Sequence, residues 1–199
     1  ALANEVQARF GAPNFVFNNA GVGSGGLIWE NTLADWEWVL GVNLMGVAHG
    51  ISAFLPGLIE RDEGHVVVTA SVAGHTAYPG LGIYSATKHA AAVIAETLYN
   101  ELASSGSKVG ATALCPGFVD TGIFNSARNR PEHLTATLPD LEADEDRATR
   151  EAFLEMIASQ ALKPAAVADL VYDAILDGTF WVFTDGRHVE NITNRHAEI

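Results

Sequence analysis

The feature that most constrains the fold is a continuous run of β-branched residues, HVVVT, at residues 65–69. An apolar run without alternating polar residues is the mark of a strand that is covered on both faces. Further apolar runs at residues 14–17, 109–114 and 179–184 also read as strands. Helical patterns separate these runs, and strands that alternate with helices indicate a parallel sheet with helices on both faces. The sequence therefore predicts an α/β fold with a doubly wound parallel sheet.

The predicted helices have recognisable ends. Residues 32–35 resemble a capping box and open a helix that we expect to run to about Glu60, with Pro56 bending or interrupting it. An Ala-rich helix is predicted over residues 85–103, before Gly106. The remaining predicted helices lie near residues 1–10 and over 164–176, with Gly11 and Gly178 at their ends.

The composition is that of one globular domain over residues 1–199, with 48% hydrophobic and 18% charged residues. The net charge of −13 disfavours nucleic acid and anionic lipid as partners. Charged and polar residues interrupt the apolar stretches, so we expect no segment to span a membrane. A single cysteine, Cys115, excludes an internal disulfide and fits a reducing compartment, and we expect a cytoplasmic protein. Scattered histidines give no basis for a metal site.

Polar side chains follow three of the predicted strands. Ser71 comes after HVVVT, residues 18–21 (NNAG) follow the first strand, and residues 116–121 (PGFVDT) follow the third. Ligands of open α/β sheets bind at the carboxyl ends of the strands, so the three segments indicate one crevice. Each segment alone also fits ordinary turn chemistry. Tyr84 and Lys88 are four residues apart on the Ala-rich helix and project from one face, although this spacing alone also fits an ordinary amphipathic helix.

Together these motifs resemble the short-chain dehydrogenase/reductase family. The resemblance is carried by NNAG at 18–21, VN ending at Asn43, Ser71 in TASVAG, YSATK at 84–88 and PGFVDT at 116–121. It implies a Rossmann-like sheet and an NAD(P)-dependent oxidoreductase that transfers a hydride between nicotinamide and a carbonyl or secondary alcohol. It also implies that the chain lacks its N-terminal strands and glycine-rich turn.

The family resemblance assigns a role to each of four catalytic candidates. Tyr84 would be the general acid or base, and Lys88 would lower its pKa and bind the nicotinamide ribose. Ser71 would hold the substrate oxygen against Tyr84. Asn43 would organise a water molecule for proton relay, the alternative being a polar residue inside a helix that bonds to backbone.

The same resemblance assigns cofactor contacts and a homodimer or homotetramer. The predicted residues that bind NAD or NADP are Asn19, Ala20, Gly21, Tyr84, Lys88, Pro116, Gly117, Val119 and Thr121. The G-x-G-x-x-G pattern at residues 21–26 is interpreted as a coincidental match, since the family's phosphate-binding turn lies earlier in the chain. Candidate substrate walls are residues 74–78, Ile83, Phe118, Ile123 and Phe124, which favour a hydrophobic alcohol or ketone.

Two interpretations stay open. Residues 122–163 contain an acidic stretch and a helical pattern from 144 to 161, and we interpret them as a substrate lid, the alternative being a solvated surface helix. The alternative function is a non-catalytic dinucleotide sensor or scaffold of the same fold. The presence of Ser71, Tyr84 and Lys88 argues against it, because a binding protein needs no proton donor.

Overall fold

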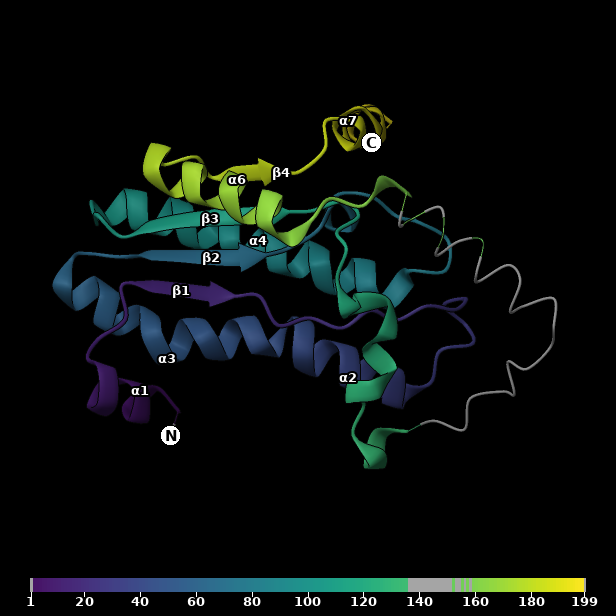
Figure 1. The fold of residues 1–199 in the computed structure, drawn as a ribbon, viewed down its shortest axis with the longest axis horizontal. Helices are drawn as coiled ribbons and strands as arrows, with labels where there is room; N and C mark the ends of the chain where they lie inside the picture. Colours follow the sequence, from purple (N-terminus) through teal and green to yellow (C-terminus); the bar gives the residue numbers. More distant parts are fainter. Residues whose placement is uncertain (1, 136–151, 153–154, 156, 158, 199) are drawn as a thin grey trace.

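Four parallel strands form the centre of the fold, in the order β1–β2–β3–β4 (Figure 1). The computed structural model describes residues 2–135, 152, 155, 157 and 159–198. The strands are β1 (Phe15–Asn18), β2 (His65–Thr69), β3 (Gly110–Cys115) and β4 (Trp181–Phe183). In the register, Val66 pairs with Val16 on one side and Ala111 on the other. The predicted parallel α/β sheet is confirmed.

Helices cover both faces of this sheet (Figure 1). On one face, Val66 and Val68 pack with residues of α3 (Met45–Arg61) and α4 (Gly82–Ser105). On the other face, Val67 packs against α6 (Pro164–Asp177). The remaining helices are α1 (Leu2–Phe10), α2 (Leu33–Asn43) and α7 (Arg187–Ala197), with short 3₁₀ turns η1 (Val72–Gly74), η2 (Gly122–Asn129) and η3 (Glu132–Leu134).

The helix predicted from residue 32 to about 60 is divided in two at Leu44. Thr32 caps α2 with the predicted capping box: its hydroxyl accepts from the Asp35 amide, and the Asp35 carboxylate accepts from the Thr32 amide. Pro56 does not interrupt the helix, because it lies inside α3, and the bend expected there stays a prediction. The break instead falls at Leu44, whose φ of −104° and ψ of −57° depart from regular helix.

The stretch Leu33–Arg61 is also more apolar than we expected. An 18-residue window within it has a mean hydropathy of 1.5, so by length and composition it passes as a helix able to cross a membrane. By length and hydropathy, the expectation that no segment could span a membrane is wrong. A core helix of a soluble protein passes the same test, and α2 and α3 contact α4, β1 and β2. Only 22% of that window is buried, so packing against these elements covers part of its apolar surface.

The Ala-rich helix α4 packs its small side chains onto the sheet. Ala91 and Ala95 belong to the core cluster that contains Val66 and Val68, whereas Ala86 is exposed. The helix ends at Gly106, whose φ of +71° is the left-handed conformation that glycine adopts readily. The first turn of α4 carries Tyr84 to the carboxyl end of the sheet.

The segment after β3 runs through η2 and η3 alongside α2 (Figure 1). It is the first part of the predicted lid at residues 122–163. The helical pattern predicted over 144–161 falls largely outside the described residues, so the lid stays a prediction.

Candidate active site

The carboxyl ends of β1, β2 and β3 are joined by short polar contacts. The Thr69 hydroxyl, at the end of β2, donates to the side-chain oxygen of Asn19 at 2.9 Å. The Val72 amide donates to the carbonyl oxygen of Pro116 at 3.1 Å. The segments NNAG, TASVAG and PGFVDT are therefore adjacent, as their positions after parallel strands predict.

Ser71 and Tyr84 are brought together at this edge. Ser71 caps η1, where its hydroxyl accepts from the Ala73 amide at 3.1 Å, and its side chain is buried. The Ser71 hydroxyl also donates to the Pro116 carbonyl at 3.4 Å. Burial raises the pKa of Tyr84, and the nearby Ser71 side chain offsets only part of that rise. The expectation that the pKa of Tyr84 is lowered is wrong, because the loss of solvation outweighs the effect of Ser71.

Lys88 places an ammonium group beside Tyr84 in a buried position. Its Nζ lies 5.7 Å from the centroid of the Tyr84 ring and donates to the carbonyl oxygen of Thr69 at 2.8 Å. The residue is 3% exposed, and burial lowers its pKa to about 8. The Lys88 ammonium is thus desolvated.

Asn43 holds the turn that follows β1. Its Oδ1 accepts from the Val22 amide at 2.8 Å, while Nδ2 donates to the Val22 carbonyl at 3.0 Å and to Oγ1 of Thr87 at 3.1 Å. This is the backbone-bonded arrangement that the sequence left as the alternative to proton relay. A Cβ placed on Gly21 would lie 3.5 Å from Nζ of Lys88 and 3.6 Å from Oδ1 of Asn43. Gly21 therefore borders both residues.

The predicted cofactor residues after β3 lie at the same edge. The Gly117 amide donates to Oγ1 of Thr184 at 3.0 Å. Val119 pairs with Leu162 in an isolated parallel bridge, and Thr121 caps η2. Asn19 and Ala20 are exposed after β1.

Two sets of predicted substrate-wall residues lie away from Ser71, Tyr84 and Lys88. Ile83 is fully buried in a core cluster with Trp38 and Val39, because the first turn of α4 faces α2 at that position. Gly74 and His75 line a cavity of about 400 Å³ that is bounded by α4, β4 and α7. None of the four catalytic candidates lines that cavity. His75 packs there against Trp181 and Phe183, and its Nε2 lies 3.5 Å from Sγ of Cys115.

Sequence reasoning missed two supporting residues. Thr87 donates to the Tyr84 carbonyl at 2.8 Å and accepts from Nδ2 of Asn43. Because Thr87 lies inside the YSATK motif, the motif could have indicated it. Ser126 accepts from the Gly23 amide at 2.9 Å across the site. No local pattern in the sequence marks Ser126.

The G-x-G-x-x-G pattern does not form a tight strand-to-helix turn. Gly21 and Gly23 follow β1, but α2 begins only at Leu33 after the Thr32 cap. Gly26 has a φ of +106° and lies within the intervening loop. The interpretation of this pattern as a coincidence agrees with the geometry, because the helix that follows the pattern begins seven residues after Gly26.

The residues present at this edge fit a nicotinamide dinucleotide. Lys88 carries three N–H donors, and among the described residues one hydrogen bond, to the Thr69 carbonyl, is found for them. Gly21 leaves open the space next to that ammonium. Hydroxyl acceptors of a ribose match such a donor chemically, and the buried setting strengthens the contact.

Comparison with known proteins identifies the family of the chain. The sequence profile described as short chain dehydrogenase matches residues 1–132. A CLA biosynthesis dehydrogenase/reductase of Lactiplantibacillus plantarum is 26% identical over 98% of this chain and 68% of its own length. An uncharacterized oxidoreductase of Staphylococcus saprophyticus is 33% identical over 88% of this chain and 64% of its own length.

A solved structure shows the same fold at higher identity. The crystal structure of a short chain dehydrogenase/reductase from Burkholderia phymatum in complex with NAD has a TM-score of 0.91 and 40% identity, covering 99% of this chain and 70% of that one. The chain belongs to the short chain dehydrogenase family. It spans about two thirds of the length of these relatives.

Proposed function

We propose that the protein is an NAD(P)-dependent oxidoreductase that interconverts a hydrophobic secondary alcohol and its ketone. The observation that carries the proposal is the buried Lys88 ammonium 5.7 Å from the centroid of the Tyr84 ring, with Ser71 close enough to lower the pKa of Tyr84. The NAD in the Burkholderia phymatum structure supports the cofactor class. A bound nicotinamide dinucleotide would supply or accept the hydride.

Tyr84 is suited to protonate a developing alkoxide. Because its pKa is raised by burial, the phenol carries its proton at neutral pH. Ser71 donates a second hydrogen bond to the same substrate oxygen, so both hydroxyls stabilise negative charge there. In the oxidative direction the phenol must first ionise, and the nearby Lys88 ammonium favours that step by its charge.

Lys88 and Asn43 keep this geometry in place. Lys88 is fixed by the Thr69 carbonyl and is directed to hold the ribose hydroxyls. Asn43 fixes the turn at Val22, and with it Gly21, next to the ammonium. The proposed cofactor contacts after β3 come from Pro116, Gly117, Val119 and Thr121. We also propose that the protein works in the cytoplasm as a homodimer or homotetramer.

The proposal is tested with the variant Tyr84→Phe. Titration of NADH and NADPH, followed by nicotinamide fluorescence, measures binding, and a panel of hydrophobic alcohols and ketones measures turnover. We expect both the wild type and Tyr84→Phe to bind the cofactor. Turnover by Tyr84→Phe should be at least about 10²-fold lower than turnover by the wild type. Undiminished turnover would refute the role of Tyr84. Cofactor binding by the wild type without any turnover would favour the sensor or scaffold alternative.

A further inference from the structure

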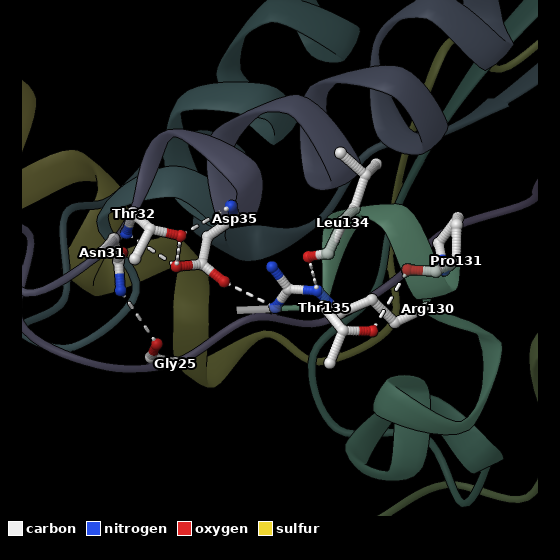
Figure 2. Close-up of polar contacts among 8 residues, drawn as sticks. All are labelled: Gly25, Asn31, Thr32, Asp35, Arg130, Pro131, Leu134 and Thr135. Carbon is white, nitrogen blue, oxygen red and sulfur yellow. Dashed lines mark hydrogen bonds and ion pairs between the residues drawn. The ribbon is translucent and has the colours of Figure 1, made fainter. Parts of the chain in front are cut away.

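Arg130, directly after η2, buries its guanidinium against α2. Its side chain is 10% exposed, and the side chain of Asp35 that faces it is 13% exposed. Nη1 of Arg130 donates to Oδ1 of Asp35 at 2.5 Å, and the guanidinium carbon lies 5.1 Å from the centroid of the Trp38 ring. Figure 2 shows that this ion pair joins the segment after β3 to the first turn of α2.

Arg130 also fixes the chain that follows it. Its Nε donates to the Leu134 carbonyl at 2.6 Å (Figure 2). Leu134 packs against the core cluster that contains Trp38 and Ile83. Since Ile83 immediately precedes Tyr84, the same cluster locates both residues 130–134 and the start of α4.

A second contact attaches this segment nearer the candidate site. The Gly23 amide donates to Oγ of Ser126 at 2.9 Å. Gly23 follows Val22, whose amide and carbonyl are bonded to Asn43. Residues 122–134 are thus attached at two places. Arg130 binds the N-terminal end of α2, and Ser126 binds the turn after β1 that Asn43, at the C-terminal end of α2, holds.

The two carboxylate oxygens of Asp35 have different partners. Oδ2 accepts from the amide and the hydroxyl of Thr32, both at 2.7 Å, which completes the capping box of α2 (Figure 2). Oδ1 faces Arg130. Partial burial acts to raise the pKa of Asp35, but hydrogen bonds from Thr32 and Arg130 outweigh it, so the net pKa is lowered and the carboxylate stays ionised.

The ion pair is a poor means of stabilising the fold. Nη2 of Arg130 is buried and has no hydrogen-bond partner in the described part of the chain. Well-packed apolar side chains often serve as well as a buried ion pair, because removing charges from water is costly. What the pair provides is a directional connection between two distant segments.

We propose that Asp35 and Arg130 are positioning residues that hold residues 122–134 as the substrate-facing wall of the Ser71–Tyr84 site. The inference rests on the proposed oxidoreductase function. The segment directly follows the turn at 116–121, and it reaches the turn after β1 through Ser126 and Gly23. The ion pair itself touches none of the four catalytic candidates, so its loss should affect substrate binding rather than the hydride-transfer step.

The kinetic test compares Arg130→Gln, Asp35→Asn and the double variant. Each single change is expected to raise substrate KM about tenfold, with kcat changed less than about threefold. The double variant should be no worse than either single one, because both changes break the same contact. The dissociation constants of NADH and NADPH should stay within about twofold. Arg130→Lys, which keeps the charge, should recover part of the loss in KM.

Two matched variants separate positioning from general stability. Thr32→Ala removes the side-chain cap of α2 but keeps the hydrogen bond from Arg130 to Oδ1 of Asp35. Arg9→Gln breaks an exposed arginine–carboxylate pair, between Arg9 and Glu5 in α1, outside the proposed wall. Both should leave KM within about twofold. A KM increase in Thr32→Ala equal to that in Arg130→Gln would overturn the proposal.

Amide hydrogen exchange tests the attachment without any substrate. Residues 122–134 should exchange about tenfold faster in Arg130→Gln than in the wild type or Arg9→Gln. Unchanged exchange would overturn the proposal, and so would faster exchange with an unchanged KM. If the wild type turns over no alcohol or ketone, the proposed function fails, whereas the exchange result still supports or overturns the attachment.

Discussion

Nζ of Lys88 lies 5.7 Å from the centroid of the Tyr84 ring. The ammonium is therefore close to the ring. Burial raises the pKa of the phenol, and Ser71 offsets part of that rise. The division of roles between these three residues leads to separate expectations for each.

Replacing Ser71 with Ala should shift the pH dependence of alcohol oxidation. Ser71 lowers the pKa of Tyr84. Its removal should raise that pKa, so the rise of kcat/KM with pH should move to higher pH. We expect kcat/KM to fall about 10²-fold because one oxyanion donor is lost. Thr76→Val is the control, since Thr76 is a nearby buried hydroxyl that bonds the Val72 carbonyl. An unchanged pH dependence in Ser71→Ala would contradict this prediction.

Replacing Lys88 with Met should stabilise the fold while removing activity. The pKa of Lys88 is lowered from 10.5 to about 8 by burial, which corresponds to roughly 3 kcal/mol of unfavourable desolvation at neutral pH. The Thr69 carbonyl loses its donor in the variant, so we expect a net gain of about 1–2 kcal/mol in urea unfolding. Lys108→Met, at an exposed site, should change stability by less than about 0.5 kcal/mol.

The sign of this effect depends on pH. The unfolded chain holds the lysine proton up to about pH 10.5, whereas the folded chain releases it near pH 8. The wild type therefore gains stability as pH rises from 8 towards 10.5. The advantage of Lys88→Met should shrink over that range, and an advantage that does not change with pH would argue against a charged, desolvated Lys88.

Replacing Gly74 with Ala should destabilise the contact between η1 and α4. An added Cβ would lie 2.7 Å from the carbonyl oxygen of Lys88, which is backbone and cannot swing away. We expect a loss of about 1–3 kcal/mol in unfolding free energy. Gly41→Ala is the matched control inside α2, because nothing lies within 4 Å of its added Cβ. That change should be neutral or stabilising by up to about 1 kcal/mol.

His65 should make the fold less stable in mild acid. Thr112 donates its hydroxyl proton to the Thr179 carbonyl at 3.0 Å, so Nε2 of His65, 2.8 Å from that hydroxyl, carries the hydrogen. Burial lowers the pKa of His65 below its ordinary 6.5. As pH falls through 6.5 the unfolded chain takes up the proton first, so stability is lost. Urea unfolding at pH 7.5 and 5.5 should show a smaller loss for His65→Gln than for the wild type, and His49→Gln, at an exposed position, should behave like the wild type.

The sheet and the positions of Ser71, Tyr84 and Lys88 could be predicted from sequence because both depend on local patterns. The β-branched run at 65–69 requires burial on both faces, and parallel strands bring their carboxyl ends to one edge. The spacing of Tyr84 and Lys88 likewise fixes them on one helix face. These features need no knowledge of distant partners.

The features that sequence could not predict depend on contacts between distant segments. Ile83 looked like a pocket residue from its place next to Tyr84, but α2 covers it. The capping box at 32–35 was recognised, yet nothing near Asp35 indicates that its second oxygen meets Arg130. The direction of the Tyr84 pKa shift was wrong for the same reason, since burial is set by the whole fold.

The incompletely bonded Lys88 ammonium also makes the folded protein responsive to what it binds. Any small molecule that brings oxygen acceptors to this group adds its own contacts and offsets the loss of hydration at the same time. The melting temperature should therefore rise clearly when a ligand binds at the Lys88 ammonium. A thermal-shift screen of polyols and nucleotides could thus find ligands for the protein before any substrate is known.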